Sequence, residues 1–289
     1  MSLSLSFSQG VAKLVSNVAV AIAPPVLINN AREWSLRRGI RRYKARRVVR
    51  SYCGYPLEIQ LSDPTAEEWY SEGWSEPDLQ GLDLLRKHRL KSGALVFDLG
   101  AHQCVWALIL ARIVGPSGRV IALEPDEHNS QVGAINKTLN AADNLIIESA
   151  AAAARSGEIR FRTGFNGFVD DGRKTYGHTR VTARSVDDLA REYGTPDVLF
   201  IDVEGYEVHV LDGARSTLAS APDCFIEVHV GAGLERFGGT VEEIVEFFPS
   251  ASYALFISSP LATSGAVPFA AGHPITGSRF FLTAIGRNR

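Results

Sequence analysis

Four side chains that can bind or move a proton stand in two pairs, each at the end of a predicted buried strand. Asp202 and Glu204 come at the end of "DVLFID", and Glu227 and His229 near the end of "DCFIEVHV". A two-residue step keeps side chains on one face of an extended strand, and parallel neighbouring strands end at the same edge of a sheet. We therefore expect the four groups to meet in one cleft, where they could take a proton from a hydroxyl group.

His229 is the first candidate for the base, because an imidazole titrates near neutral pH. Structural roles compete for all four residues: Asp202 as a helix cap, Glu204 as a cap or ion-pair partner, Glu227 as a buried hydrogen-bonded acid and His229 as a structural histidine. The predicted catalytic residues are His229, Asp202 and Glu204. The carboxylates would also suit Mg²⁺, although no residue is assigned to a metal.

The stretch "LVFDLGAHQCVW", residues 95–106, has the form of a ligand-binding loop between a buried strand and an apolar helix. In open α/β sheets, ligands bind beyond the carboxyl ends of the strands. The loop lacks the G-x-G-x-x-G pattern that lets a backbone approach a pyrophosphate, and it places the carboxylate of Asp98 near the site instead. A carboxylate repels a pyrophosphate but attracts the ammonium and sulfonium groups of S-adenosylmethionine.

A second acid favours the same cofactor. Glu124 ends the next predicted strand, 24 residues after Gly100, where an acid can accept hydrogen bonds from both hydroxyls of a ribose. S-adenosylmethionine has a ribose and no phosphate, so the loop suits it better than NAD. The predicted cofactor-binding residues are Asp98, Gly100, Ala101, His102, Cys104, Glu124 and Pro125.

From residue 94 onward, strand-like apolar runs alternate with helix-length segments. The expected strands are 94–99, 119–124, 144–149, 197–202 and 223–230, and the expected helices 102–114, 127–140, 185–193, 206–220 and 240–248. This alternation is typical of a parallel sheet covered on both faces. "YALFIS" and "RFFLTAIG" add a terminal antiparallel pair. The pattern predicts an α/β fold with a mostly parallel seven-stranded sheet, helices on both faces, a small β insertion at 157–185 and an N-terminal extension.

An ordered set of motifs resembles the FkbM family of S-adenosylmethionine-dependent methyltransferases. The motifs are "FDLGA", "GPSGRVIALEPDEHN", "TARSVDDL", "LFIDVEGYEVHVLDGA" and "FIEVH", between about residues 90 and 230. The resemblance implies a class I methyltransferase with a Rossmann-like fold. It also implies O-methylation, often of hydroxyls on sugars, and we expect the acceptor to be a sugar, a glycolipid or a secondary metabolite.

The cofactor loop differs from the usual family loop, Asp-x-Gly-Ala-Asn-x-Gly, at two positions. His102 replaces the Asn and Cys104 the second Gly, and Phe200 stands where the family commonly has Lys. S-adenosylmethionine presents only a carboxylate near the helix N-terminus, so the loop needs a missing side chain less than a phosphate-binding loop does. We expect the sulfur of Cys104 to pack under the loop. A reactive nucleophile is the alternative, although no basic neighbour is evident that would lower its pKa.

The charges of the chain are unevenly distributed. Residues 1–50 hold ten Lys and Arg against Glu33 alone, whereas the rest of the chain holds 20 against 31 acids, for a net charge of −2. Eight of the cations lie in residues 37–50, after the weakly apolar segment 14–28. This pattern fits a peripheral membrane contact of residues 14–50 with anionic lipid. A basic helix that packs on the acidic domain is the alternative.

The three cysteines, Cys53, Cys104 and Cys224, form no CxxC pair and fit a reducing cytosol better than a disulfide framework or a structural zinc site. No apolar run reaches the ~18 residues of a membrane-spanning helix, and residues 15–28 would make a poor signal peptide. We expect a cytoplasmic protein whose basic arm offers a contact with membranes. The net charge near zero argues against nucleic acid as a partner.

The chain is expected to divide into a basic N-terminal arm (1–50), an N-terminal subdomain or substrate cap (51–92), and a methyltransferase domain (93–289). Within the cap, residues 61–78 are expected to form loops and short turns, and residues 83–93 a short helix. The cap, the loop 164–178 and the Gly-rich stretch 231–239 are expected to shape the acceptor pocket. Two rival functions are an NAD-dependent oxidoreductase, which the missing glycines disfavour, and a non-catalytic binding protein that keeps the fold.

Overall fold

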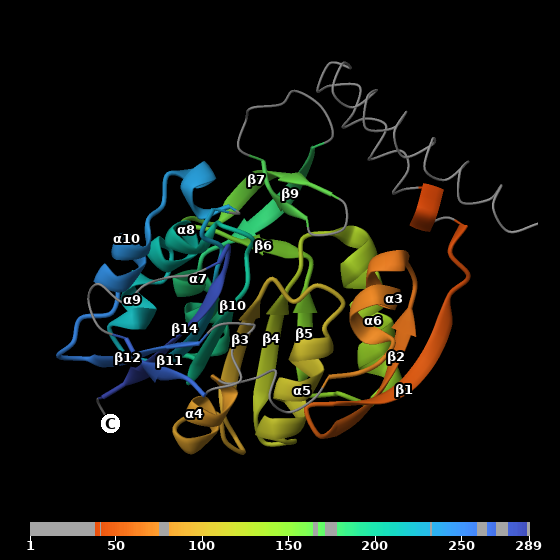
Figure 1. Ribbon diagram of the computed structural model, residues 1–289, viewed down its shortest axis with the longest axis horizontal. Coiled ribbons are helices and arrows are strands. Elements are labelled where there is room, and N and C mark those ends of the chain that lie inside the picture. Colours follow the sequence, from red (N-terminus) through yellow and green to blue (C-terminus); the bar gives the residue numbers. More distant parts are fainter. Residues whose placement is uncertain are drawn as a thin grey trace, which may run out of the picture.

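The protein is built around one large sheet with helices on both faces (Figure 1). The structure is a computed structural model that describes residues 38–40, 42–74, 81–163, 167–170, 178–231, 233–258, 265–269 and 277–287. Most of the predicted basic arm, residues 1–37 and 41, lies outside the described residues, as does most of the loop 164–178.

The sheet contains five parallel strands in the spatial order β5 (Leu145–Glu148), β4 (Arg119–Leu123), β3 (Leu95–Leu99), β10 (Val198–Ile201) and β11 (Asp223–Val228). They are short, largely apolar runs; β3, β4, β10 and β11 are mostly buried on both faces, and β5 at the edge is partly buried. β14 (Phe280–Gly286) pairs antiparallel with β11 and with β12 (Tyr253–Ser258), which confirms the predicted terminal antiparallel pair. The sheet has eight described strands rather than the predicted seven, because β13 (Val267–Pro268) adds a two-residue edge.

Two apolar cores lie on the opposite faces of this sheet, because successive side chains of a strand point to opposite sides. One core includes residues of α4 (Leu82–Lys87) and α5 (Val105–Val114), and α6 (Glu127–Leu139) lies against α5 and β5. The other core is covered by α7 (Val186–Tyr193), α8 (Glu207–Asp212), α9 (Arg215–Leu218) and α10 (Val241–Glu246). The helices on both faces are therefore as predicted.

The segment before the sheet is more regular than the sequence predicted. β1 (Arg46–Tyr52) and β2 (Tyr55–Leu61) form an antiparallel hairpin, and α3 (Pro64–Tyr70) follows. The prediction of loops and short turns for residues 61–78 is therefore wrong at α3, whereas the short helix predicted at 83–93 corresponds to α4. β1 crosses the expected boundary between the arm and the cap at residue 50. The hairpin turns at Cys53 and Gly54, whose φ angles of 53° and 83° are those that a tight two-residue turn requires.

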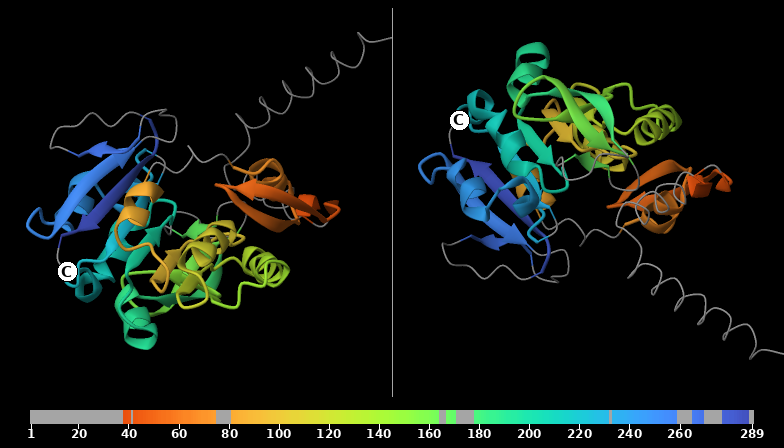
Figure 2. Two further views of the ribbon diagram at one scale, coloured as in Figure 1. Left: turned by 90° about the horizontal axis from the view of Figure 1, so that it is seen from below. Right: turned by 90° about the horizontal axis from the view of Figure 1, so that it is seen from above.

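Asn136 of α6 and Asn140, the residue that caps its C-terminus, fix the hairpin to the main body. Asn136 Oδ1 accepts the backbone N–H of Gln60 at 2.8 Å, and Asn140 Oδ1 accepts that of Glu58 at 3.1 Å. These bonds satisfy strand-edge donors that would otherwise be unpaired on β2. The hairpin therefore sits beside α6, at the opposite end of the molecule from β12 and β14 (Figure 2).

The predicted β insertion forms a second, smaller sheet. Its strands are β6 (Ala150–Ala152), β7 (Gly157–Arg162), β8 (Phe168–Val169) and β9 (Thr179–Arg184), in the order β6-β9-β7-β8. It stands at the carboxyl ends of the parallel strands, above β4 and β5 in Figure 1. No helix within the described residues is long and apolar enough to cross a membrane.

Candidate functional site

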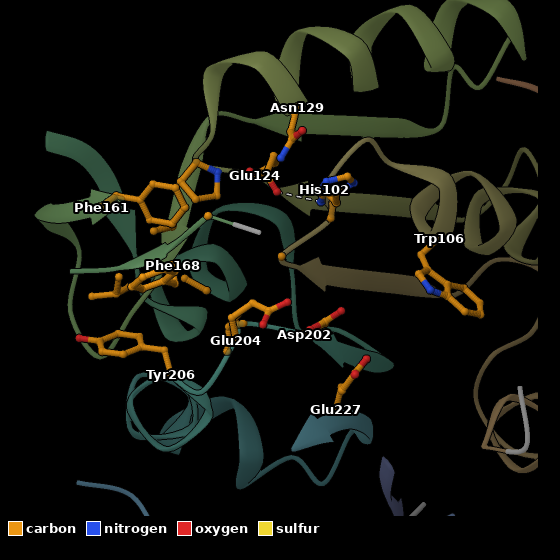
Figure 3. Close-up of a pocket in the computed structure, with 18 of the residues that line it drawn as sticks. His102, Trp106, Glu124, Asn129, Phe161, Phe168, Asp202, Glu204, Tyr206 and Glu227 are labelled. Atoms are coloured by element: carbon orange, nitrogen blue, oxygen red, sulfur yellow. Dashed lines mark hydrogen bonds between the residues drawn. The ribbon is translucent and has the colours of Figure 1, made fainter. Parts of the chain in front are cut away.

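A cavity of about 380 Å³ opens at the carboxyl ends of the parallel strands (Figure 3). The loops after β3, β4 and β10 and the end of β11 contribute Gly100, Ala101, His102, Glu124, Pro125, Asp202, Val203, Glu204, Tyr206 and Glu227. Helices α3, α5 and α6, with the segment around residue 74, contribute Trp69, Tyr70, Trp74, Trp106 and Asn129. The small sheet and the start of β14 contribute Ala151, Ala152, Phe161, Gly167, Phe168, Val169 and Arg279.

Seven of the ten predicted site residues line this cavity: Gly100, Ala101, His102, Glu124, Pro125, Asp202 and Glu204. Asp98, Cys104 and His229 lie behind the cavity wall. The sequence interpretation also missed lining residues on other elements, among them Asn129, Trp106 and Tyr206. Trp106 and Asn129 lie on helices whose apolar or polar pattern alone gives no sign of a pocket, whereas Tyr206 directly follows the predicted "IDVEG" loop.

Gly100 is required by the packing of the protein itself. Its φ is 96°, and a Cβ on this residue would lie 1.8 Å from the backbone oxygen of Asp202. The loops after β3 and β10 therefore approach each other more closely than any side chain at residue 100 would allow. This approach brings the predicted cofactor loop next to the carboxylates of Asp202 and Glu204.

Cys104 stands where the family loop has glycine, and its backbone has the left-handed conformation that glycine favours, with φ 63°. Its side chain is fully buried, and a Cβ added at Gly133 of α6 would lie 2.6 Å from its Sγ. Burial raises the pKa of the Cys104 thiol well above its ordinary value. The thiol thus packs under the loop as predicted, and a protonated thiol outside the cavity lining is unsuited to act as a nucleophile.

His102, which replaces the family's Asn, joins the loop to the N-terminal helix. Its Nδ1 lies 2.7 Å from the hydroxyl of Tyr70, and its ring packs against that of Trp69, with centroids 5.1 Å apart. Gln103 makes a second connection, since its Nε2 donates to the Asp63 carboxylate that caps α3. The replacement therefore lets the loop after β3 pack against α3.

Glu124 holds the loop and faces the cavity at the same time. Its two carboxylate oxygens accept the backbone N–H groups of His102 at 2.8 Å and Asp126 at 2.7 Å. Burial is the main cause that raises its pKa to about 8. Asp98 is also buried, its Oδ2 has no hydrogen-bond partner within the described part of the chain, and burial raises its pKa to about 7. Both acids would be stabilised in their ionised form by a cation or by hydroxyl donors.

Three carboxylates converge on the far side of the cavity from Glu124. Asp202 and Glu204 follow β10, and Glu227 lies in β11 (Figure 3). Arg279 donates to Oε1 of Glu227 at 2.9 Å. Burial, followed by the charges of Glu227 and Glu204, raises the pKa of Asp202 well above its ordinary value. Glu204 has a φ of 53°, a strained conformation for a residue with a side chain that is often found at functional sites.

His229 comes from the same strand end but is only 4% exposed and lies behind these carboxylates. Its Nε2 lies 3.5 Å from Glu204, 3.8 Å from Asp202 and 3.8 Å from Glu227. The four groups therefore meet as the two-residue spacing predicted. The expectation that His229 faces the acceptor does not hold, since the side chain does not line the cavity.

Asp202, Glu227 and His229 bring one nitrogen or oxygen atom each within 4.8 Å of one another. The hydrogen bonds and charges around His229 raise its pKa to about 9, and a protonated imidazole offers no lone pair to a metal. Mg²⁺ also prefers oxygen ligands. The comparisons with known proteins give no support for Mg²⁺, and we assign it no site.

An aromatic wall closes the side of the cavity next to the hairpin. The rings of Trp74 and Trp106 are 5.1 Å apart, and Trp106 packs on Phe200 at 5.3 Å. Phe200, which replaces the family's Lys, is buried and stacks on Phe225 with the ring planes 16° apart. The Phe200 replacement therefore supports an aromatic surface instead of supplying a charge.

The strand order β5-β4-β3-β10-β11-β14-β12, with β14 alone antiparallel among these seven strands, defines the class I methyltransferase fold. Enzymes of this class take the methyl group from S-adenosylmethionine. The family model described as "Methyltransferase FkbM domain" matches residues 98–255, more than half of the chain, and the chain belongs to this family. It is a methyltransferase.

The sequence identity to solved structures is low. An S-adenosylmethionine-dependent O-methyltransferase from Thermotoga maritima is 14% identical, with 82% of this chain and 76% of that chain covered and a TM-score of 0.45. An rRNA methylase from Streptococcus thermophilus is 12% identical over 71% and 92% of the two chains, with a TM-score of 0.44. No curated protein sequence matched the chain. The family assignment therefore rests on the family match and the strand order.

Proposed function

We propose that the cavity binds S-adenosylmethionine and that the enzyme methylates a hydroxyl oxygen of a sugar, a glycolipid or a secondary metabolite. The observation that carries this proposal is the division of the cavity into two acidic sides. Glu124 and the loop after β3 form one side, and Asp202, Glu204 and Glu227 form the other. The first side suits a cofactor with a ribose and positive charge, and the second suits an acceptor that must lose a proton.

The residues on the cofactor side fit S-adenosylmethionine. The carboxylate of Glu124 would accept the ribose hydroxyls, and Gly100, Ala101, His102 and Pro125 would surround the cofactor. Asp98 and Cys104 would act from behind this wall, Asp98 through its buried charge and Cys104 through loop shape. The cofactor supplies an electrophilic methyl group, and the protein must position the acceptor oxygen behind it.

The residues on the acceptor side suit a hydroxyl-bearing molecule. Carboxylates accept hydrogen bonds and cannot donate them when ionised, so Asp202, Glu204 and Glu227 select hydrogen-bond donors. Trp69, Trp74 and Trp106 offer flat apolar surfaces for the rest of the acceptor. Glu204 and Asp202 face the cavity and would receive the acceptor's proton, with His229 behind them.

The sharpest test of the cofactor proposal is the change Glu124→Gln in the full-length chain. It keeps the shape of the side chain but removes the charge, and should weaken S-adenosylmethionine binding by about 1.5–3 kcal/mol because charge-assisted hydrogen bonds are lost. Titration calorimetry measures this directly. Glu127→Gln, at an exposed acid in the first turn of α6, is the matched control and should leave the affinity unchanged. Equal affinity in both variants would rule out the assigned ribose contact.

The same protein distinguishes the two rival functions. Mass spectrometry of the bound cofactor separates S-adenosylmethionine from NAD. A metabolite that is 14 mass units lighter in cells without the gene than in cells with it would identify the acceptor. A protein that binds S-adenosylmethionine but yields no such difference, and no turnover of the cofactor with cell extract, would favour the non-catalytic alternative.

We further propose that the enzyme is cytoplasmic and contacts anionic membrane lipid through residues 14–50. Only residues 38–40 and 42–50 of this segment belong to the described structure. Among them Arg42, Lys44 and Arg50 are exposed. They belong to the N-terminal unit (described residues 38–40 and 42–74), which also carries Trp69 of the cavity wall. No nucleic-acid partner is part of this proposal.

A further inference from the structure

His229 is held from behind by an acid that the motif analysis did not single out. Its Nδ1 lies 2.7 Å from Oε1 of Glu207, at the start of α8. Glu207 has no exposed surface and does not line the cavity. A fully buried carboxylate in contact with an imidazole is expected to be paired with a cation.

The other nitrogen of His229 faces the cavity carboxylates. Its Nε2 lies 3.5 Å from Glu204 Oε2, 3.8 Å from Asp202 Oδ1 and 3.8 Å from Glu227 Oε1. Figure 3 shows Asp202, Glu204 and Glu227 converging on one part of the cavity. The imidazole therefore lies between one buried acid and three acids of the cavity wall.

This arrangement concentrates negative charge that needs a cation. His229 lies among these acids, and Arg279 donates to Glu227 from the side of β14. Burial alone would lower the pKa of His229, but the hydrogen bond to Glu207 and the charges of Asp202 and Glu204 outweigh it and raise the pKa to about 9. At neutral pH the imidazole thus carries a proton on each nitrogen and cannot accept another.

Glu207 also shapes the turn that carries Glu204. Its Oε1 accepts the backbone N–H of Gly205 at 2.9 Å. Glu204 and Gly205 both have left-handed backbones, with φ of 53° and 99°. One carboxylate therefore holds the strained turn and the imidazole together, which fixes the position of Glu204 relative to His229.

We propose that Glu207 is a positioning residue that holds His229 as an imidazolium, and that this buried cation favours the ionised forms of Asp202 and Glu204, which face the cavity. This step rests on the methylation proposed above: as the methyl group passes from the cofactor's sulfur to the acceptor oxygen, the acceptor O–H bond breaks and its proton passes to a carboxylate oxygen. His229 keeps both of its protons throughout. Glu204, whose side chain is 32% exposed, can then return the proton to water.

The charge of His229 can be measured without any acceptor or cofactor. The full-length protein, labelled with ¹⁵N in its seven histidines, is titrated by NMR through the imidazole nitrogen shifts. His229→Gln assigns the signal by its disappearance, and single changes of the other six histidines assign it by elimination if that variant does not fold. We expect both nitrogens of His229 to be protonated at pH 7.5, with titration at about pH 9. A neutral His229 at pH 7 would overturn the proposal.

The role of Glu207 is tested by Glu207→Gln, which keeps the shape and an oxygen for the Nδ1–H bond but removes the charge. The pKa of His229 should fall by about one unit or more, since an opposite charge in contact typically shifts a pKa by that amount. Glu243→Gln, at the capping box of α10, is the matched control and should not move it. An unchanged titration in Glu207→Gln would overturn the assignment of Glu207.

The pH profile of turnover separates a positioning role from a catalytic one, once an acceptor is in hand. Without the cation, the carboxylates should bind protons more tightly. The acid limb of kcat/KM in His229→Gln should therefore move to higher pH, with turnover recovering above it. Loss of turnover at every pH, with normal S-adenosylmethionine binding, would instead make His229 the base. Absence of cofactor binding would count against the proposed function but leave the titration result valid.

Discussion

At the residue scale, burial favours the protonated forms of the two acids on the cofactor side, Asp98 and Glu124. Burial raises the pKa of Asp98 to about 7 and that of Glu124 to about 8. Each acid therefore holds a proton over part of the neutral range when no ligand is present. A positively charged ligand with hydroxyl donors favours the ionised forms, so its binding should drive these protons off.

The affinity for S-adenosylmethionine should therefore depend on pH. Between pH 6 and 7.5 a proton has to be removed before the best contacts form, so the affinity should rise with pH, by up to ~1.4 kcal/mol per pH unit for each proton released. Calorimetry in two buffers of different ionisation enthalpy measures the proton release. Glu124→Gln should reduce both the release and the slope. An affinity independent of pH, with no release of protons, would contradict the pKa values of both acids.

At the element scale, the cofactor loop and α6 are matched to each other. The left-handed residue of the loop is Cys104, and the helix opposite it has a glycine, Gly133, whose missing Cβ leaves room for the sulfur. The usual family loop has the glycine in the loop instead. The missing side chain of Gly133 in α6 thus makes room for the sulfur of Cys104 in the loop.

This match predicts coupling between the two positions. Gly133→Ala should destabilise the fold by about 1–3 kcal/mol through overpacking, although alanine is the better helix former. Cys104→Gly should change stability by ~1 kcal/mol or less, since relief of the left-handed strain offsets lost packing. In the double variant the clash is gone, so it should be more stable than Gly133→Ala alone. Urea unfolding of the four proteins gives the coupling energy, and simple additivity would refute the match.

The same comparison serves the question of reactivity. Cys104→Gly should bind S-adenosylmethionine as well as the natural chain does, and should keep its turnover, because the thiol is buried and protonated. A variant that binds cofactor but has lost turnover would show that the sulfur takes part in the chemistry after all.

The elements that the sequence predicted well are those whose pattern comes from burial. The five parallel strands are apolar runs bounded by turns, and their ends lie within a few residues of the predicted ones. The helices between them also lie close to their predicted ranges, except that the segment 206–220 forms two helices, α8 and α9. The hairpin and α3 were missed because β1 is rich in arginine and mostly exposed, so it resembles a solvated charge run. What stabilises them is distant in sequence: Asn136 and Asn140 bond β2 from 76 and 82 residues away.

The same limit applies to the site. The spacing of Asp202, Glu204, Glu227 and His229 predicted that they meet, because the period of a strand is fixed. It did not predict that His229 lies behind the acids. This placement depends on the contact of His229 with the buried Glu207, which strand spacing does not show. Trp106 and Asn129 could not be found from local pattern, because their exposure to the cavity is set by where β4, the hairpin and the small sheet lie.

At the scale of the whole molecule, the N-terminal unit joins the acceptor side of the cavity to a basic surface. Trp69, 38% exposed, lines the cavity from α3. On β1 and just before it, Arg42, Lys44 and Arg50 are exposed, and the sequence has no acid between Glu33 and Glu58. Arg46 and Arg47 are also exposed, but each has an acidic partner, Glu67 and Glu58. A negatively charged surface that bound these cations would lie near the aromatic wall, where a lipid-linked acceptor could enter.

Binding to anionic vesicles tests this arrangement. The full-length chain should float with vesicles of phosphatidylcholine and phosphatidylglycerol, but not with phosphatidylcholine alone, and salt should release it because exposed charges are screened. Changing Arg42, Lys44 and Arg50 together to Gln should weaken binding by about 3 kcal/mol, at roughly 1 kcal/mol for each cation. The control changes Arg86, Lys87 and Lys91, three exposed cations on and after α4, and should bind as before. Equal flotation of both triple variants would exclude the lipid contact, and so would binding to RNA with none to vesicles. Vesicle binding that is lost only in the first variant would place the acceptor side of the enzyme at a membrane surface.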